Sequence, residues 1–164
     1  MPDITLDGCD RVNISTPTSS GGSETLVLFD GSSKCKLLGG SIVNCQEHAV
    51  MLVDSSDCTV QDVTIDGAGG NTDNTYDGVI LSGDSDRNLI SGIQVVARAV
   101  SPLTRYGINV SASTCDCNIV VGNVLGDPAD YGTDALNDAG TDTQLFYPND
   151  ATYGDNFTAC DPTS

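Results

Sequence analysis

The chain has 164 residues, enough for one domain with a continuous core. It carries 23 Asp and Glu against six Lys and Arg, a formal net charge of -17. This charge excludes free nucleic acid and anionic membranes as partners, because both are polyanions. No apolar stretch approaches the roughly 20 residues of a membrane span, and Met1-Pro2-Asp3 lacks the pattern of a signal peptide.

Two kinds of short apolar strand alternate along the chain after residues 1–24, which we expect to form an N-terminal cap and first coil. The first kind is predicted at 25–28, 49–52, 78–81 and 107–110, with a degenerate copy at 132–135, and a polar turn follows each of the first four. The second kind begins at Cys35, Cys58, Asn88 and Cys117, spaced by 23, 30 and 29 residues, with aliphatic residues two and seven positions later. Strand, turn, strand and longer loop, repeated at this interval, predict the coils of a solenoid.

Coils this small bury their apolar faces only by stacking, which places equivalent residues above one another. We therefore expect an internal column of Cys35, Cys58, Asn88 and Cys117, and an aliphatic column of Leu26, Val50, Val79 and Ile108. Most of the seven cysteines are then predicted to be small, reduced core residues.

This periodicity resembles the pectate-lyase-like superfamily over residues 4–145. The resemblance implies an all-β fold: a right-handed, single-stranded parallel β-helix of about five coils with short terminal caps, its coils at 25–140 and its C-terminal cap at 141–164. The alternative is an antiparallel β-sandwich, which leaves the columns unexplained. The superfamily includes lyases, hydrolases, epimerases, tailspikes and adhesins, so the fold alone does not choose a function.

The longest polar loop, 66–77, contains three carboxylates, Asp66, Asp73 and Asp77, that can bind Ca²⁺ or another hard cation. Asn71-Thr72-Asp73 is similar to a polygalacturonase motif, but the other carboxylate pair, the Gly-His-Gly and the Arg-Ile-Lys of those enzymes are absent. A solvated loop is the alternative. Arg98 and Arg105 share a later loop, where they can contact an anionic sugar or a neighbouring subunit, or neutralise local acid.

His48 is the single histidine and directly precedes a predicted strand. The positions predicted to be equivalent are Glu24, Asp77, Tyr106 and Tyr131, and stacking would make the five an outward row able to bind carbohydrate. The alternative is a polar corner that faces water.

Val27, Met51 and Ile80 alternate with predicted inward residues, so we expect them to form an outward apolar stripe. Such a stripe is covered either by the long loops or by another subunit, and a homotrimer would bury it around a threefold axis.

The acidic, Lys-poor composition is similar to that of proteins from halophilic archaea and their viruses, and it predicts stability that rises with salt. The favoured hypothesis is a non-enzymatic structural or binding β-helix on a virion or extracellular surface in high salt, such as a decoration, turret or tailspike-like protein. Its partners would be other virion proteins or a surface glycan. The alternative is a polysaccharide lyase, hydrolase or epimerase. A metal-delivery β-helix is disfavoured because His and Met are few.

Overall fold

The fold was analysed in a computed structural model, which describes residues 2–22, 24–98 and 100–146. Its strands form three parallel sheets. The first contains β1 (Ile4–Asp7), β4 (Val27–Asp30), β7 (Val50–Val53), β10 (Val79–Ser82), β13 (Tyr106–Val110) and β15 (Asp134–Asp138). The second contains β2 (Asn13–Ser15), β5 (Lys36–Leu38), β8 (Thr59–Gln61), β11 (Leu89–Ser91), β14 (Ile119–Val121) and β16 (Gln144–Phe146). The third contains β3 (Thr18–Ser20), β6 (Ser41–Val43), β9 (Thr64–Asp66) and β12 (Gln94–Val96), and a 3-10 turn, η1, spans Pro128–Asp130.

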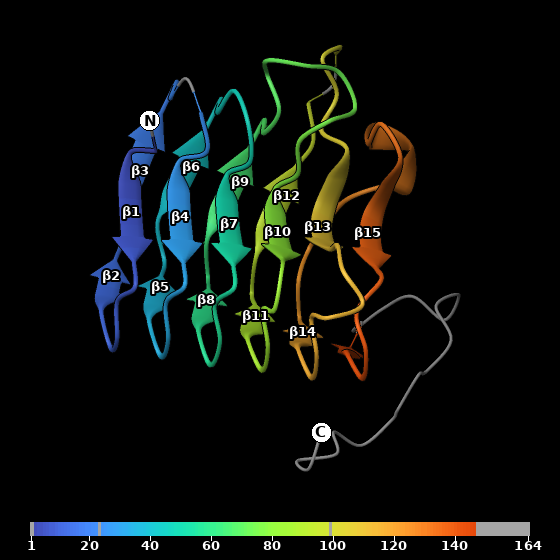
Figure 1. Ribbon diagram of the computed structural model, residues 1–164. Coiled ribbons are helices and arrows are strands. Elements are labelled where there is room, and N and C mark those ends of the chain that lie inside the picture. The colour runs from blue at the N-terminus through green and yellow to red at the C-terminus, as the bar shows by residue number, and fades with distance from the viewer. Residues whose placement is uncertain (1, 23, 99, 147–164) are drawn as a thin grey trace.

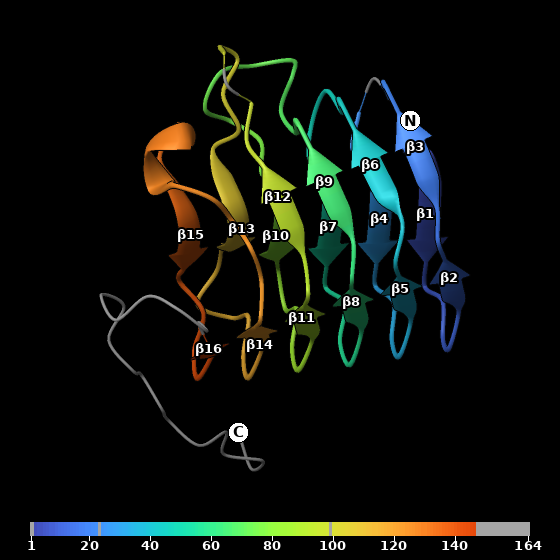
Figure 2. The ribbon, with the colours of Figure 1, turned by 180° about the vertical axis from the view of Figure 1, so that it is seen from behind.

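Each of the first four coils contributes one strand to each of the three sheets, whereas the last two contribute strands to the first and second sheets only. The coils stack side by side into a solenoid (Figures 1 and 2). The predicted parallel β-helix is therefore confirmed, and the antiparallel sandwich is excluded for the described strands. The first sheet has six strands, so the solenoid has about six coils where about five were predicted. The strands β1 to β3 form the first coil, which was expected within residues 1–24. The right-handed sense of the coil stays a prediction, and residues 147–164 of the predicted C-terminal cap lie outside the described part of the chain.

The corner between the first and second sheets uses a left-handed backbone in every coil. The residues there are Arg11, Lys34, Asp57, Arg87, Cys117 and Asp142, with φ between 52° and 59°. Such angles are uncommon for residues other than glycine and are most easily reached by Asn and Asp. Stacking in register imposes the same turn on every coil, so the corner position is fixed by the fold and not by one residue type.

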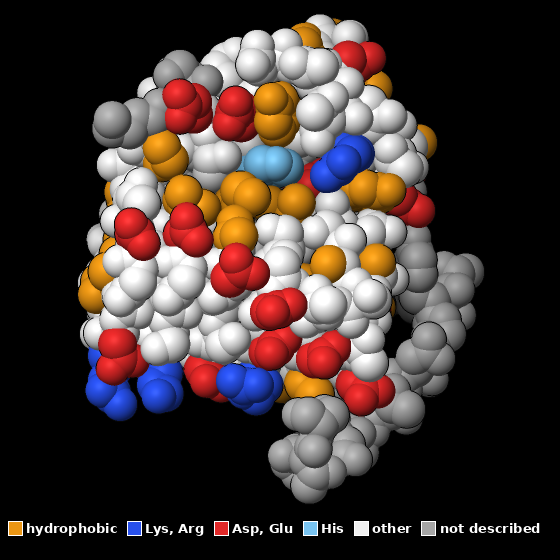
Figure 3. Space-filling view, in the orientation of Figure 1, with side chains coloured by type: hydrophobic (Ala, Val, Ile, Leu, Met, Phe, Trp, Pro, Cys, Tyr) orange, Lys and Arg blue, Asp and Glu red, His pale blue; other side chains and the backbone are white. Residues whose placement is uncertain are grey.

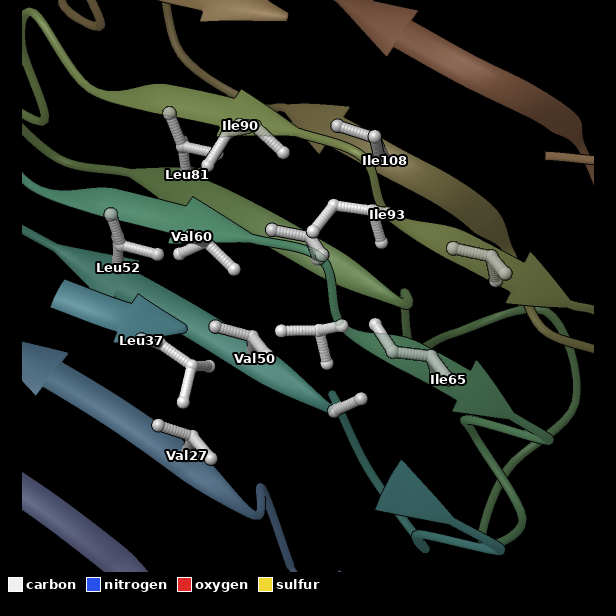
Figure 4. Packing of buried hydrophobic residues seen from close by; sticks show 14 of the residues in the cluster. Val27, Leu37, Val50, Leu52, Val60, Ile65, Leu81, Ile90, Ile93 and Ile108 are labelled. Atoms are coloured by element: carbon white, nitrogen blue, oxygen red, sulfur yellow. The ribbon is translucent and has the colours of Figure 1, made fainter. Parts of the chain in front are cut away.

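The core is a set of aliphatic columns enclosed by the three sheets (Figure 4). One column joins Val27, Val50, Val79 and Ile108, which pair in register and are at most 1% exposed. Burial of one such side chain stabilises the fold by roughly 1.5–3 kcal/mol. The same burial is repeated in each column and stabilises the packing of one coil on the next.

Polar side chains inside the solenoid satisfy backbone groups that the sheets leave unpaired. The buried hydroxyl of Ser55 accepts the N–H of Ser32 at 3.0 Å, and that of Ser85 accepts the N–H of Ser55 at 3.2 Å. The Asn88 side chain accepts the N–H of Cys58 at 2.9 Å and donates to the carbonyl of Ser55 at 2.8 Å. These hydrogen bonds link each coil to the next where a buried unpaired backbone group would be costly.

Two predicted columns are wrong by one residue. Leu89 pairs with Ile119, so Asn118 lies under Asn88, whereas Cys117 occupies the left-handed corner and is disulfide-bonded. In the aliphatic column, Val27 takes the place predicted for Leu26. A shift of one residue reverses the face of every following side chain, which is why Leu125 is 7% exposed and Val124 is 61% exposed.

The cysteine prediction is otherwise confirmed for the described residues. Four free thiols are buried, Cys35, Cys45, Cys58 and Cys115, and Cys9 is free and half-buried. No helix in the described residues is long and apolar enough to cross a membrane.

Candidate ligand-binding face

The outer face of the first sheet carries a row of side chains that alternate along each strand with the side chains facing the core. The register places Leu28, Met51, Ile80 and Asn109 in this row. The prediction that Val27 points outward is wrong, because Val27 pairs with Val50 and is 1% exposed. Met51 is half-buried and Ile80 is 7% exposed, so the apolar row is partly covered within the chain itself.

Figure 3 shows a band of apolar side chains across this face, with the single histidine beside it and a basic side chain next to the histidine. We use the term His48 face for the surface formed by His48, Met51, Tyr76, Ile80, Arg105 and Tyr106. These residues come from β7, β10 and β13 and from the segments that lead into those strands.

The predicted outward row through His48 is only partly correct. His48, Asp77 and Tyr106 are equivalent in register, but the next position is Asp134 and not Tyr131. Glu24 lies one residue away from the position equivalent to His48. Tyr131 is 5% exposed, its hydroxyl donates to the carbonyl of Leu125, and burial raises its pKa. Tyr131 is therefore part of the interior.

Asp77 was expected at the surface, but its side chain is fully buried. Arg105 donates from Nε to Oδ1 at 2.9 Å and from Nη2 to Oδ2 at 2.6 Å, and Asn109 donates to Oδ2 at 2.9 Å. The ion pair also raises the pKa of Arg105. Three donors therefore engage the carboxylate, and its charge is neutralised locally.

The backbone next to Asp77 fixes the position of this ion pair. A side chain at Gly78 would come within 2.5 Å of the Gly107 carbonyl oxygen, so adjacent coils approach too closely here for any residue but glycine. The Arg105 guanidinium also lies 5.3 Å from the centre of the Tyr106 ring, a distance that allows a cation–π contact.

His48 lies against the same corner with its side chain 13% exposed. Its Nδ1 accepts the backbone N–H of Asp77 at 3.0 Å and lies 3.6 Å from Asp77 Oδ2. Burial lowers the pKa of His48 and outweighs the opposite effect of the Asp77 charge. The ring packs edge-on against Tyr76, with centroids 5.1 Å apart, and the Tyr76 hydroxyl is 3.5 Å from Glu47 Oε1.

The three carboxylates predicted to bind a cation are not brought together. Asp73 Oδ1 accepts the N–H of Leu103 at 2.7 Å, Asp77 pairs with Arg105, and Asp66 is exposed at the end of β9. In residues 2–22, 24–98 and 100–146, no group of three or more His, Cys, Asp or Glu side chains is arranged to hold a metal ion. The loop carboxylates therefore do not form the predicted cation site.

The two loop arginines also have different partners. Arg98 Nη1 donates to the Gly67 carbonyl at 3.3 Å, and its Nε is buried without a hydrogen-bond partner. Arg105 neutralises Asp77, as the local-acid alternative predicted. The loop that contains both arginines packs on the 66–77 loop through Thr104, whose hydroxyl donates to the Ala68 carbonyl at 2.7 Å.

A family model described as "Periplasmic copper-binding protein (NosD)" matches residues 2–131 of this chain. The chain belongs to the NosD family. NosD is a parallel β-helix family of the pectate-lyase-like superfamily, so the predicted resemblance is confirmed at that level. No curated protein and no solved structure matches the chain.

The described residues do not fit a copper site of this chain's own. Copper(I) prefers thiolates, thioethers and imidazoles. The thiols of Cys35, Cys45, Cys58 and Cys115 each lie 3.3–3.4 Å from a backbone carbonyl oxygen to which they donate. Burial raises the pKa of Cys45 to about 11, which disfavours its thiolate. The Nδ1 lone pair of His48 is already engaged.

Sequence reasoning did not single out Tyr76 or Glu47 as neighbours of His48. The available signal was the position of Tyr76 directly before Asp77, the residue equivalent to His48 in the next coil. The hydrogen bond from Asn109 to Asp77 was not predicted either.

Proposed function

We propose that this chain is a non-enzymatic binding module on an extracytoplasmic surface, and that its His48 face binds carbohydrate. One observation carries the proposal: the Tyr76 ring packs against His48 and the Tyr106 ring lies by Arg105, on the sheet face where the half-buried Met51 stands in the outward row. Aromatic and apolar side chains can pack on the C–H faces of a sugar ring, while nearby N–H groups bond its hydroxyl oxygens.

Two further observations support an extracytoplasmic location. The matching family is described as periplasmic, and Cys117 is disulfide-bonded, which is typical of oxidising compartments. The acidic composition supports a high-salt setting, and we propose the surface of a halophilic virus as that setting, where the module would decorate a virion.

The geometry does not favour the lyase or hydrolase alternative. Asp77 is fully buried and accepts hydrogen bonds from Arg105 and Asn109, so it cannot serve as a general base without breaking them. Arg105 is held in its charged form by the same pair. Neither residue is available for proton transfer.

Isothermal titration of the full chain with cellohexaose, laminarihexaose and an oligogalacturonate tests the proposal. We expect a neutral glucan oligomer to bind and Tyr106→Ala to weaken binding about tenfold, or roughly 1.4 kcal/mol. Val124→Ala is the matched control, because Val124 is exposed near β12, away from the His48 face. Equal losses in both variants, or no binding by any oligomer, would remove the proposal.

A further inference from the structure

We infer that His48 serves this face as a hydrogen-bond donor locked in one tautomer, so that the face takes a neutral oxygen acceptor such as a sugar hydroxyl and not a copper ion. The choice of ligand rests on the function proposed above. The role of the imidazole rests on the local geometry alone.

The tautomer follows from the partner of Nδ1. The backbone N–H of Asp77 points at Nδ1 from 3.0 Å, so this nitrogen must offer its lone pair. A neutral imidazole with an acceptor at Nδ1 carries its proton on Nε2. The Asp77 carboxylate, 3.6 Å from the same nitrogen, is turned toward Arg105 and Asn109 and does not compete for a proton there.

This arrangement opposes copper binding at His48. A metal ion needs an imidazole lone pair, and the one on Nδ1 already accepts the Asp77 N–H. Binding at Nε2 would move the proton to Nδ1, where it would face the N–H of Asp77 and lose the hydrogen bond. Met51 lies in the outward row and is close to His48 in sequence. A copper site made of His48 and Met51 would still need the imidazole lone pair that accepts the Asp77 N–H.

The remaining polar groups of the face are mostly donors. Asp77 is saturated by three hydrogen bonds, whereas Arg105 uses Nε and Nη2 for Asp77 and is 30% exposed. In the described residues Nε2 of His48 has no hydrogen-bond partner and is not among the buried polar atoms, and the side chain is 13% exposed, so Nε2–H can reach a ligand, as can the outer N–H groups of Arg105. The Asp77–Arg105 pair is neutral, Glu47 is close by, and the chain carries -17, so an anionic acceptor is disfavoured and a neutral one fits.

Long-range ¹H–¹⁵N NMR of the full chain at neutral pH reads the tautomer directly. We expect the proton on Nε2, and we expect His48 signals that do not change when one equivalent of Cu(I) is added with a competing chelator. A proton on Nδ1 would overturn the inference. So would a stoichiometric copper complex that His48→Gln abolishes.

Two variants test the donor role against the ligand. His48→Gln keeps a side-chain N–H, so we expect cellohexaose or laminarihexaose affinity within about threefold of wild type, whereas His48→Leu should lose about tenfold. Thermal melting of both variants checks that each is folded. If Tyr106→Ala weakens binding but His48→Leu does not, the donor role is wrong and the proposed function stands. If no oligomer binds, the proposed function and the sugar acceptor both fail, and the tautomer and copper measurements still decide the role of His48.

Discussion

Replacement of Asn118 by alanine should destabilise the fold strongly, because Asn118 links two coils from inside the solenoid. Its Oδ1 accepts the N–H of Asn88 at 2.9 Å, its Nδ2 donates to the Ser85 carbonyl at 2.8 Å, and the residue is 0% exposed. Asn118→Ala leaves both backbone groups buried without a partner. At about 1–3 kcal/mol for each group, we expect the free energy of unfolding to fall by roughly 2–6 kcal/mol.

Urea unfolding at fixed salt, followed by circular dichroism, measures this loss. Asn13→Ala is the matched control, because Asn13 is exposed on β2 and a surface substitution usually changes stability by less than about 0.5 kcal/mol. The register that places Asn118 under Asn88 would be refuted if Asn118→Ala lowered the free energy of unfolding by less than about 1 kcal/mol, or by as much as the control does. Cys117 would then be the better candidate for the internal column.

We expect four other properties from the sequence and the structure. Native protein should react with a thiol reagent at Cys9, while the four buried free thiols react only on unfolding; fast reaction of all five would contradict their burial. The pKa of His48 is lowered from 6.5 in the folded protein, so its contribution to stability is complete above pH 6.5 and is lost as the pH falls through the folded-state pKa. Urea unfolding from about pH 5 to 8 should therefore show a free energy of unfolding that falls as the pH falls in wild type, and this fall should be absent in His48→Gln. The melting temperature should rise from low to molar salt as the charge of -17 is screened, and a flat or falling profile would remove the halophilic interpretation. The homotrimer expected from the sequence would use Leu28, which is half-buried in the outward row, so Leu28→Asp should dissociate a trimer in high salt; light scattering that finds a wild-type monomer contradicts this expectation.

Much of the fold could be predicted because the aliphatic columns repeat in register. Val50, Val79 and Ile108 were predicted as one column and are one in the structure. The errors occurred where the sequence offers two registers. Leu26 and Val27 are adjacent and both buried, so alternation does not choose between them. At 115–118, Cys and Asn residues crowd together, and the left-handed corner that settles the register has no fixed residue type.

The site was harder to predict because its contacts join distant parts of the chain. Aspartate is a residue type usually found at the surface. Asp77 can be buried only because Arg105, 28 residues later in the chain, pairs with its carboxylate. His48 was singled out as the one histidine, but its tautomer depends on a backbone N–H in the next coil, 29 residues away. Loop lengths and residue types do not show where two insertions pack on each other.

An NMR titration of the ¹⁵N-labelled full chain with a neutral glucan oligomer tests the central claim most directly. The account predicts shifts that gather on the His48 face, at His48, Met51, Tyr76, Arg105 and Tyr106, while amides of the third sheet stay unchanged. Saturable shifts on the third sheet, or no shifts at millimolar oligomer, would contradict it.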